Sequence, residues 1–169
     1  MRLRLAFIFV TGVLTLPSAC GRNNAEFAGF SVEPVSRKPI LANPIADEQE
    51  IYETIFQYRL EREGFKGTLF LSINGKDPSD EFMRRFSRIS RSLKKVSGSH
   101  YSAGFLLDRS TNKIGVELFI NNLTWTWPNT ADVRGGRYCG GRCLDSGIYR
   151  LRKQNGRWAV EEYQILGIA

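Results

Sequence analysis

Apolar residues recur at helical spacing in two stretches of the N-terminal half of the chain. In the first stretch, five of them fall on one side of a helix: Ile51, Tyr52, Ile55, Phe56 and Leu60. Asp47 and Glu50 stand three residues apart at its start, as in a capping box, and Gly64 follows its last turn. The pattern predicts a helix that begins at Asp47 and ends before Gly64.

The second stretch opens with Asp77-Pro78, a capping residue before a proline at the first helical position. The apolar residues that follow step by four, three, four and three: Phe82, Phe86, Ile89, Leu93 and Val96. At about 100° per residue these side chains form one stripe. We therefore expect a second helix, over 78–96, with an apolar side that faces the core.

Segments of β-type composition lie between and after these helices. Residues 68–73 form one short candidate strand, and six more follow Tyr101: 103–107, 114–120, 123–127, 133–139, 148–152 and 158–163. Asn155-Gly156 is typical of a two-residue hairpin, because both central positions of a type I′ turn need positive φ. The order of elements predicts an α+β fold, with two N-terminal helices packed on one face of a curved antiparallel sheet formed by the C-terminal half. A single domain over 47–169 holds all of these elements.

The first 19 residues have the pattern of an export signal that is removed. Arg2 and Arg4 give a positive start, residues 5–16 are apolar, and Pro17-Ser18-Ala19 places small residues before a cleavage site. The apolar run is too short for a membrane-spanning helix, which needs about 20 residues. The alternative is a buried N-terminal helix.

The segment Leu16-Pro17-Ser18-Ala19-Cys20 resembles a bacterial lipobox. This resemblance implies that Cys20 is lipidated and becomes the new N-terminus, so that the lipid bilayer is a partner. It also implies sorting to the outer membrane, facing the periplasm, if the bacterium has two membranes, because Gly21 is not the aspartate of inner-membrane retention. Pro17 departs from the usual leucine, which leaves ordinary cleavage after Ala19 as the alternative.

Residues 20–46 carry Pro34, Pro39 and Pro44 and have little apolar periodicity. This composition predicts a flexible tether between the lipid anchor and the domain. The alternative is that part of it forms a strand along the core edge, through Phe27, Phe30 and Val32.

The net charge of the whole chain is +7, and removal of a signal that carries two arginines lowers it to +5. This excess favours an acidic envelope component or protein as a partner but does not identify one. Nucleic acid is not expected as a partner, because the protein is predicted to be exported and shows no aromatic reading surface. A metal or another cofactor is not expected either.

Cys139 and Cys143 enclose Gly140-Gly141-Arg142 between two predicted strands. Thioredoxin-type chemistry uses Cys-x-x-Cys at a helix N-terminus, and a zinc site needs partners that one histidine cannot supply. The pattern favours a structural disulfide, for which the glycines give a small ring its backbone freedom. A strained and therefore redox-active pair is the alternative.

The same region carries a longer pattern. Tyr138-Cys139-Gly140-Gly141-Arg142-Cys143, Tyr149-Arg150-Leu151 and Gly156-Arg157-Trp158-Ala159-Val160 resemble a C-terminal signature of bacterial exported proteins, often small lipoproteins. Its form is Cys-Gly-x-x-Cys, an aromatic-x-Leu strand and Gly-x-Trp-x-Val. This group has no established activity, so the resemblance implies location and fold type and no catalytic residues.

Basic residues repeat along the second predicted helix, opposite its apolar stripe, at Arg84, Arg88, Arg91 and Lys95, with Arg85 and Lys94 beside them. One interpretation is a solvated helix face, whose late positive charges suit a helix C-terminus. The other is a face that contacts lipid headgroups or an acidic partner.

His100, Trp125 and Trp127 are candidates for lining a pocket. The two tryptophans alternate along a predicted strand and so share a face, which is more often core than pocket. His100 has no nucleophile and orienting group at a recognisable spacing, so no catalytic residue is assigned.

These observations favour a non-enzymatic, membrane-anchored lipoprotein domain with a binding or structural role in the bacterial envelope. Two other hypotheses remain. One is a ligand-binding or enzymatic cone, like those of the nuclear-transport-factor and cystatin-like folds, with His100 and the two tryptophans in its cavity. The other is a disulfide-exchange protein that uses Cys139 and Cys143.

Overall fold

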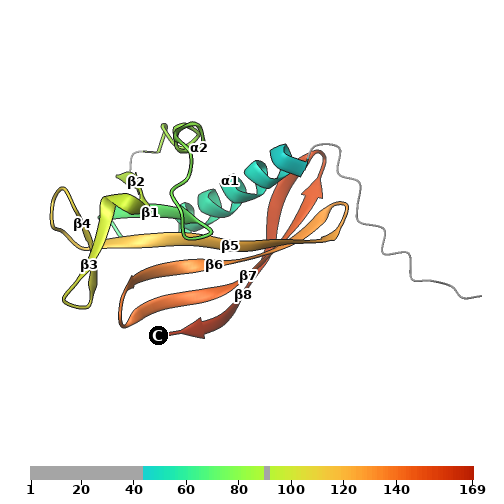
Figure 1. Cartoon of the computed structure of the whole chain (residues 1–169). Coiled ribbons are helices and arrows are strands. Elements are labelled where there is room, and N and C mark those ends of the chain that lie inside the picture. Colours follow the sequence, from blue (N-terminus) through green and yellow to red (C-terminus); the bar gives the residue numbers. More distant parts are fainter. Residues whose placement is uncertain (1–43, 90–91) are drawn as a thin grey trace, which may run out of the picture. The chain divides into compact units, whose positions relative to one another are not determined.

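The computed structural model describes residues 44–89 and 92–169. The predictions for the signal, for Cys20, for residues 20–43 of the tether and for Arg91 lie outside these residues. In chain order the elements are α1 (Pro44–Arg62), β1 (Thr68–Ile73), α2 (Asp80–Arg84), β2 (Leu93–Lys95), the 3-10 turn η1 (Val96–Gly98), β3 (Ser99–Ser102), β4 (Phe105–Asp108), β5 (Gly115–Trp127), β6 (Thr130–Gly140), β7 (Cys143–Gln154) and β8 (Arg157–Ile168) (Figure 1).

The expected arrangement of two helices on an antiparallel sheet is wrong. In the described ranges α1 is the only helix longer than five residues. The sheet has eight strands, some paired in parallel and some antiparallel. Strand β1 pairs in parallel with β2 on one side and β5 on the other. Strands β5 to β8 follow as an antiparallel meander, so the C-terminal half is antiparallel as predicted and the sheet as a whole is not.

The second predicted helix shortens to the five residues of α2. Its start is as expected, since the Oγ of Ser79 accepts a hydrogen bond from the backbone N–H of Phe82 at 3.1 Å. Further on, Leu93–Lys95 forms a strand instead of continuing the predicted helix. It pairs with the edge of β1, where Leu93 lies opposite Leu69. The backbone hydrogen bonds of this strand pairing replace those of a helix, and serines at 87 and 92 do not favour one.

The apolar stripe of that segment nevertheless marks buried residues. Phe82 and Phe86 pack edge to face against Phe56 of α1, with ring centroids 6.0 and 6.2 Å apart. The predicted inward side is therefore right for these two residues, although the helix is not.

Helix α1 covers one face of the sheet and forms the core with it. Seventeen buried residues make up this core: Ile51, Tyr52, Ile55, Phe56, Leu60, Leu69, Leu71, Phe82, Phe86, Val116, Leu118, Ile120, Ala131, Val133, Tyr149, Leu151 and Trp158. Burial of each large apolar side chain contributes about 1.5–3 kcal/mol. On the opposite face of β1, Phe70 is fully buried beside Gly98 and Gly115, so the segment from η1 to β4 covers a second, smaller core.

Asp47 does not cap α1, because the helix begins three residues earlier, at Pro44. Its side chain instead faces the sheet, where it accepts a hydrogen bond from the indole Nε1 of Trp158 at 3.0 Å and one from Lys153 Nζ. These bonds hold the pKa of Asp47 below its usual value, against the opposing effect of burial.

Hairpins connect most of the strands, and one was not expected. The strand predicted at 103–107 is interrupted by a turn at Ala103-Gly104, with φ of 49° and 85°, that joins β3 to β4. The candidates at 114–120 and 123–127 form the single strand β5, which bulges near Asn122. The Asn155-Gly156 turn is confirmed, with φ of 51° and 79°.

Candidate functional site

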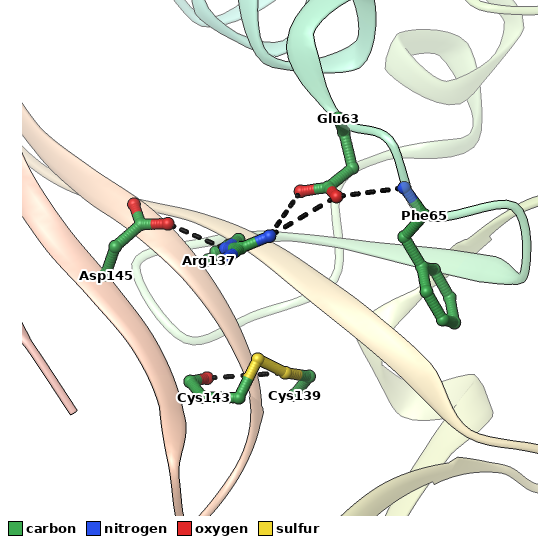
Figure 2. Close-up of a disulfide and its surroundings, with 6 residues drawn as sticks. All are labelled: Glu63, Phe65, Arg137, Cys139, Cys143 and Asp145. Carbon is green, nitrogen blue, oxygen red and sulfur yellow. Dashed lines mark hydrogen bonds and ion pairs between the residues drawn. A yellow bond between two sulfur atoms is a disulfide. The ribbon is translucent and has the colours of Figure 1, made fainter.

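The disulfide predicted between Cys139 and Cys143 is present and closes the turn between β6 and β7 (Figure 2). The two Cα atoms are 5.3 Å apart. Gly140 has φ of 141°, and a Cβ at this position would lie 2.2 Å from the carbonyl oxygen of Gly104. Glycine is therefore required here both by the backbone conformation and by the neighbouring hairpin.

The β3–β4 hairpin lies directly against this disulfide loop. The backbone N–H of Gly141 donates to the carbonyl of Gly104 at 3.0 Å, and Phe105 pairs with Gly140. Tyr101 of β3 stacks on Tyr138 of β6, with ring centroids 6.4 Å apart. Two hairpin turns that are distant in sequence thus meet at the end of the sheet.

An apolar groove of about 560 Å³ lies where these turns meet. It is lined by Ala103, Gly104, Phe105, Ile114, Cys139, Gly140, Gly141, Arg142 and Cys143. Phe105 is 50% exposed and Ile114 47%, so large apolar side chains stand open to solvent at its walls. Most of the lining is apolar, with Arg142 as its charged side chain, a composition typical of binding pockets.

An ion-pair network lies next to the disulfide in the β6–β7 hairpin (Figure 2). Arg137 and Asp145 lie opposite each other in the β6–β7 ladder, two residues before and after the cysteines, with Nε and Oδ2 2.8 Å apart. Asp145 also pairs with Arg59 and accepts a hydrogen bond from the Tyr163 hydroxyl at 2.8 Å. This network joins α1 to three strands.

Glu63 extends the network past the end of α1. Its carboxylate lies 3.3 Å from Nη1 of Arg137 and accepts a hydrogen bond from the backbone N–H of Phe65 at 3.1 Å.

Burial and the hydrogen bond to Asp145 raise the pKa of Tyr163 to about 12. The buried ring of Tyr149 stacks on Tyr163, with centroids 4.4 Å apart. Sequence reasoning missed this network, in which the Arg59–Asp145 pair alone spans 86 positions.

A second polar cluster fixes the end of β4. Asp108 has a side chain only 1% exposed, and Lys94 Nζ lies 2.8 Å from its Oδ2. The hydroxyls of Thr68 and Ser110 also donate to this carboxylate, at 2.9 and 2.8 Å. The bond from Lys94 is the main cause that holds the pKa of Asp108 well below its usual range. The β3–β4 wall of the groove is thereby anchored to β1 and β2.

The predicted row of basic residues is divided among different elements. Lys95 lies in β2, with Nζ 2.7 Å from Asp80, and Arg85 pairs with Glu53 of α1 at 2.8 Å. Arg84 and Arg88 are exposed. Because the helix ends at Arg84, these side chains do not form one continuous helical face.

The structure does not bring His100 together with the two tryptophans. His100 is half-buried in β3 and pairs with Leu107 of β4, which bridges Ile114 just before β5 begins. Trp125 lies near the far end of β5, roughly 30 Å along an extended strand. Trp125 packs against Trp158 at 5.6 Å, which is core packing. Trp127 is 73% exposed, because a bulge separates it from Trp125.

The chain matches no protein-family model, no curated protein and no solved structure. Within 44–89 and 92–169 there is no group of three or more His, Cys, Asp or Glu side chains placed to hold a metal ion. Nor does any helix in these ranges have the length and apolar character needed to cross a membrane.

Proposed function

We propose that this chain is an exported, lipid-anchored domain of the bacterial envelope with a non-enzymatic binding role. It holds an apolar segment of a partner protein in the groove beside the disulfide. The location rests on the sequence: the signal pattern at 1–19, the lipobox-like position of Cys20 and the C-terminal pattern that resembles exported bacterial proteins. The anchor places the domain on the bilayer, at the outer membrane facing the periplasm where two membranes are present.

The groove is the observation that carries the binding role. Phe105 and Ile114 stay about half exposed there, next to Arg142. Aromatic residues and arginine are enriched in the cores of protein interfaces. The disulfide and the ion pair behind it fix one wall before a partner arrives, which lowers the entropic cost of binding.

Site-specific crosslinking in the host bacterium tests this role. A photoreactive phenylalanine analogue at Phe105 is expected to give a crosslink to one discrete protein. The same analogue at Trp127, an exposed aromatic position near the far end of β5, is the matched control and should not give it. Equal crosslinking from both positions, or none from Phe105, would exclude the groove as the binding site.

The location has its own test, an intact mass of the native protein extracted from host membranes. A chain that starts at Cys20 and carries acyl groups supports the anchor. A chain that starts at Cys20 without acyl groups, or that keeps residues 1–19, would contradict the anchor and leave the groove proposal standing.

Disulfide exchange is a second candidate function, because both half-buried cysteines line the open groove. A partner's thiolate would attack one sulfur, the other would leave as a thiolate, and a second partner thiol would resolve the mixed disulfide. Titration in glutathione buffers decides this point. A reduction potential above about −200 mV favours exchange, and one below about −300 mV favours a structural bond.

A further inference from the structure

Three exposed cations either line the groove or directly precede a residue at or beside it in the chain, and together they are called its rim. Arg142 is one of the lining residues. Lys113 directly precedes Ile114, another lining residue, and Lys66 directly precedes Gly67, where a Cβ would lie 3.2 Å from the carbonyl oxygen of Ile114. All three side chains are exposed.

These cations differ from others nearby, because no carboxylate among residues 44–89 and 92–169 lies within ion-pair distance of them. Lys94 and Arg137, by contrast, are both paired with carboxylates. Two buried acids of the described residues are already engaged: Asp108 by Lys94 and two hydroxyls, and Glu63 by Arg137. The rim of the groove is therefore positive and uncompensated by the described part of the chain.

From this rim we infer that the partner segment is acidic as well as apolar. The inference rests on the proposed binding role and adds the charge of the ligand to it. Apolar side chains of the segment occupy the space between Phe105 and Ile114, while its carboxylates face Lys66, Lys113 and Arg142. Charge complementarity of this kind raises the association rate and excludes basic partners.

A protein segment fits this site better than a lipid surface does. The groove is concave, and much of its wall is the backbone of two hairpin turns, at 103–104 and 140–141. Such a wall receives side chains from a protruding segment, whereas a bilayer presents a plane. Anionic vesicles therefore belong in the test as the competing ligand.

The experiment selects binders from a displayed library of random peptides. The target is the purified full-length protein in its oxidised form. Counter-selection on the double variant Phe105→Ser with Ile114→Ser removes peptides that bind elsewhere. We expect the remaining peptides to be rich in Asp or Glu together with Phe, Leu or Ile. Their affinity should fall by about tenfold or more between low salt and 0.5 M salt, because exposed charges are screened.

Charge reversal at the rim provides the matched comparison. The triple variant Lys66→Glu, Lys113→Glu and Arg142→Glu should lose the acidic peptides. The triple variant Lys76→Glu, Arg134→Glu and Arg157→Glu changes three exposed cations that do not line the groove, alters the net charge equally and should keep them.

The other outcomes separate this inference from the proposed role. Groove-dependent peptides that are neutral or basic would overturn the acidic ligand and leave the binding role intact. Absence of any groove-dependent peptide would overturn both. Rim-dependent binding to vesicles of phosphatidylglycerol and phosphatidylethanolamine, without peptide binding, would also overturn both and assign the rim to a lipid surface.

Discussion

Arg137 and Asp145 face each other across the β6–β7 hairpin, with Nε and Oδ2 2.8 Å apart, two residues along each strand from the disulfide (Figure 2). Asp145 is 14% exposed and also pairs with Arg59, so one carboxylate serves two guanidinium groups. Loss of this carboxylate removes the ion pair of the largely buried Arg59 and leaves Arg137 paired with Glu63.

We therefore expect Asp145→Asn to lower the free energy of unfolding by about 2–3 kcal/mol, below the usual cost of a fully buried pair because Arg137 is 41% exposed. Denaturation in urea measures the change. Glu161→Gln, which removes the exposed pair with Arg152, is the control and should cost less than about 0.5 kcal/mol. Similar losses for the two variants would contradict a special role for Asp145.

The disulfide encloses a short loop, and its contribution should be correspondingly small. Reduction, or the double variant Cys139→Ser with Cys143→Ser, is expected to remove about 2 kcal/mol of stability, the loop-closure entropy of a five-residue ring. Thermal unfolding with and without a dithiol reductant measures this, and the double variant should not respond to the reductant. A wild-type protein whose melting temperature ignores complete reduction would contradict the prediction.

Adjacent glycines in the same loop should respond differently to alanine. At Gly140 the added Cβ meets the carbonyl oxygen of Gly104 at 2.2 Å and φ is positive, so Gly140→Ala is expected to cost about 1–3 kcal/mol. At Gly141 the nearest contact of a Cβ is the Tyr101 hydroxyl at 3.5 Å, and Gly141→Ala should be nearly neutral. Paired denaturation curves decide the matter, and an equal cost at both positions would count against the packing of the two hairpins.

Acid should weaken the contact between α1 and β8 through Asp47. The pKa of this carboxyl is lowered in the folded state, so its contribution to stability is present above the unfolded value of about 3.9 and is lost as pH falls through the lower folded value. In Asp47→Asn that contribution is absent at every pH. The loss of stability below pH 4, followed by Trp fluorescence, should then be smaller in the variant than in the wild type, and equal losses would contradict this assignment.

The sequence was informative wherever a local rule decides the structure. Helical spacing located α1, Asn155-Gly156 located the last hairpin, and the spacing of Cys139 and Cys143 indicated their disulfide. In each case the residues that fix the geometry are close neighbours in the chain. Local chemistry is then sufficient.

The prediction of the second helix was wrong because a partner distant in the chain decides the structure of that segment. The spacing from Phe82 to Val96 records which side chains turn inward, and a short helix followed by a strand satisfies it as well as a long helix does. The deciding interaction is the pairing of Leu93 with Leu69, which no helical periodicity contains. A competing partner distant in sequence overrode the local preference.

The groove and the network behind it could not be predicted for a related reason. Gly104 and Gly140 meet only because β4 pairs with β6, and Glu63 reaches Arg137 across 74 positions. The small residues at 103–104 and 140–141 are the signal in the sequence for this contact, since the close approach of two backbones requires small side chains. Without the sheet order, that signal does not say which turns meet.

The parallel pairing of β1 with β5 has a consequence for synthesis. Among the described elements, α1 and β1 are synthesised first, and the strands that complete the sheet, β5 to β8, come last (Figure 1). Until those strands emerge, the apolar side of α1 has only β1 and the segment around Phe82 and Phe86 to pack against, so most of the core is still missing. For a protein exported as proposed above, this order keeps the chain fit for passage across a membrane and delays folding until the last residues arrive.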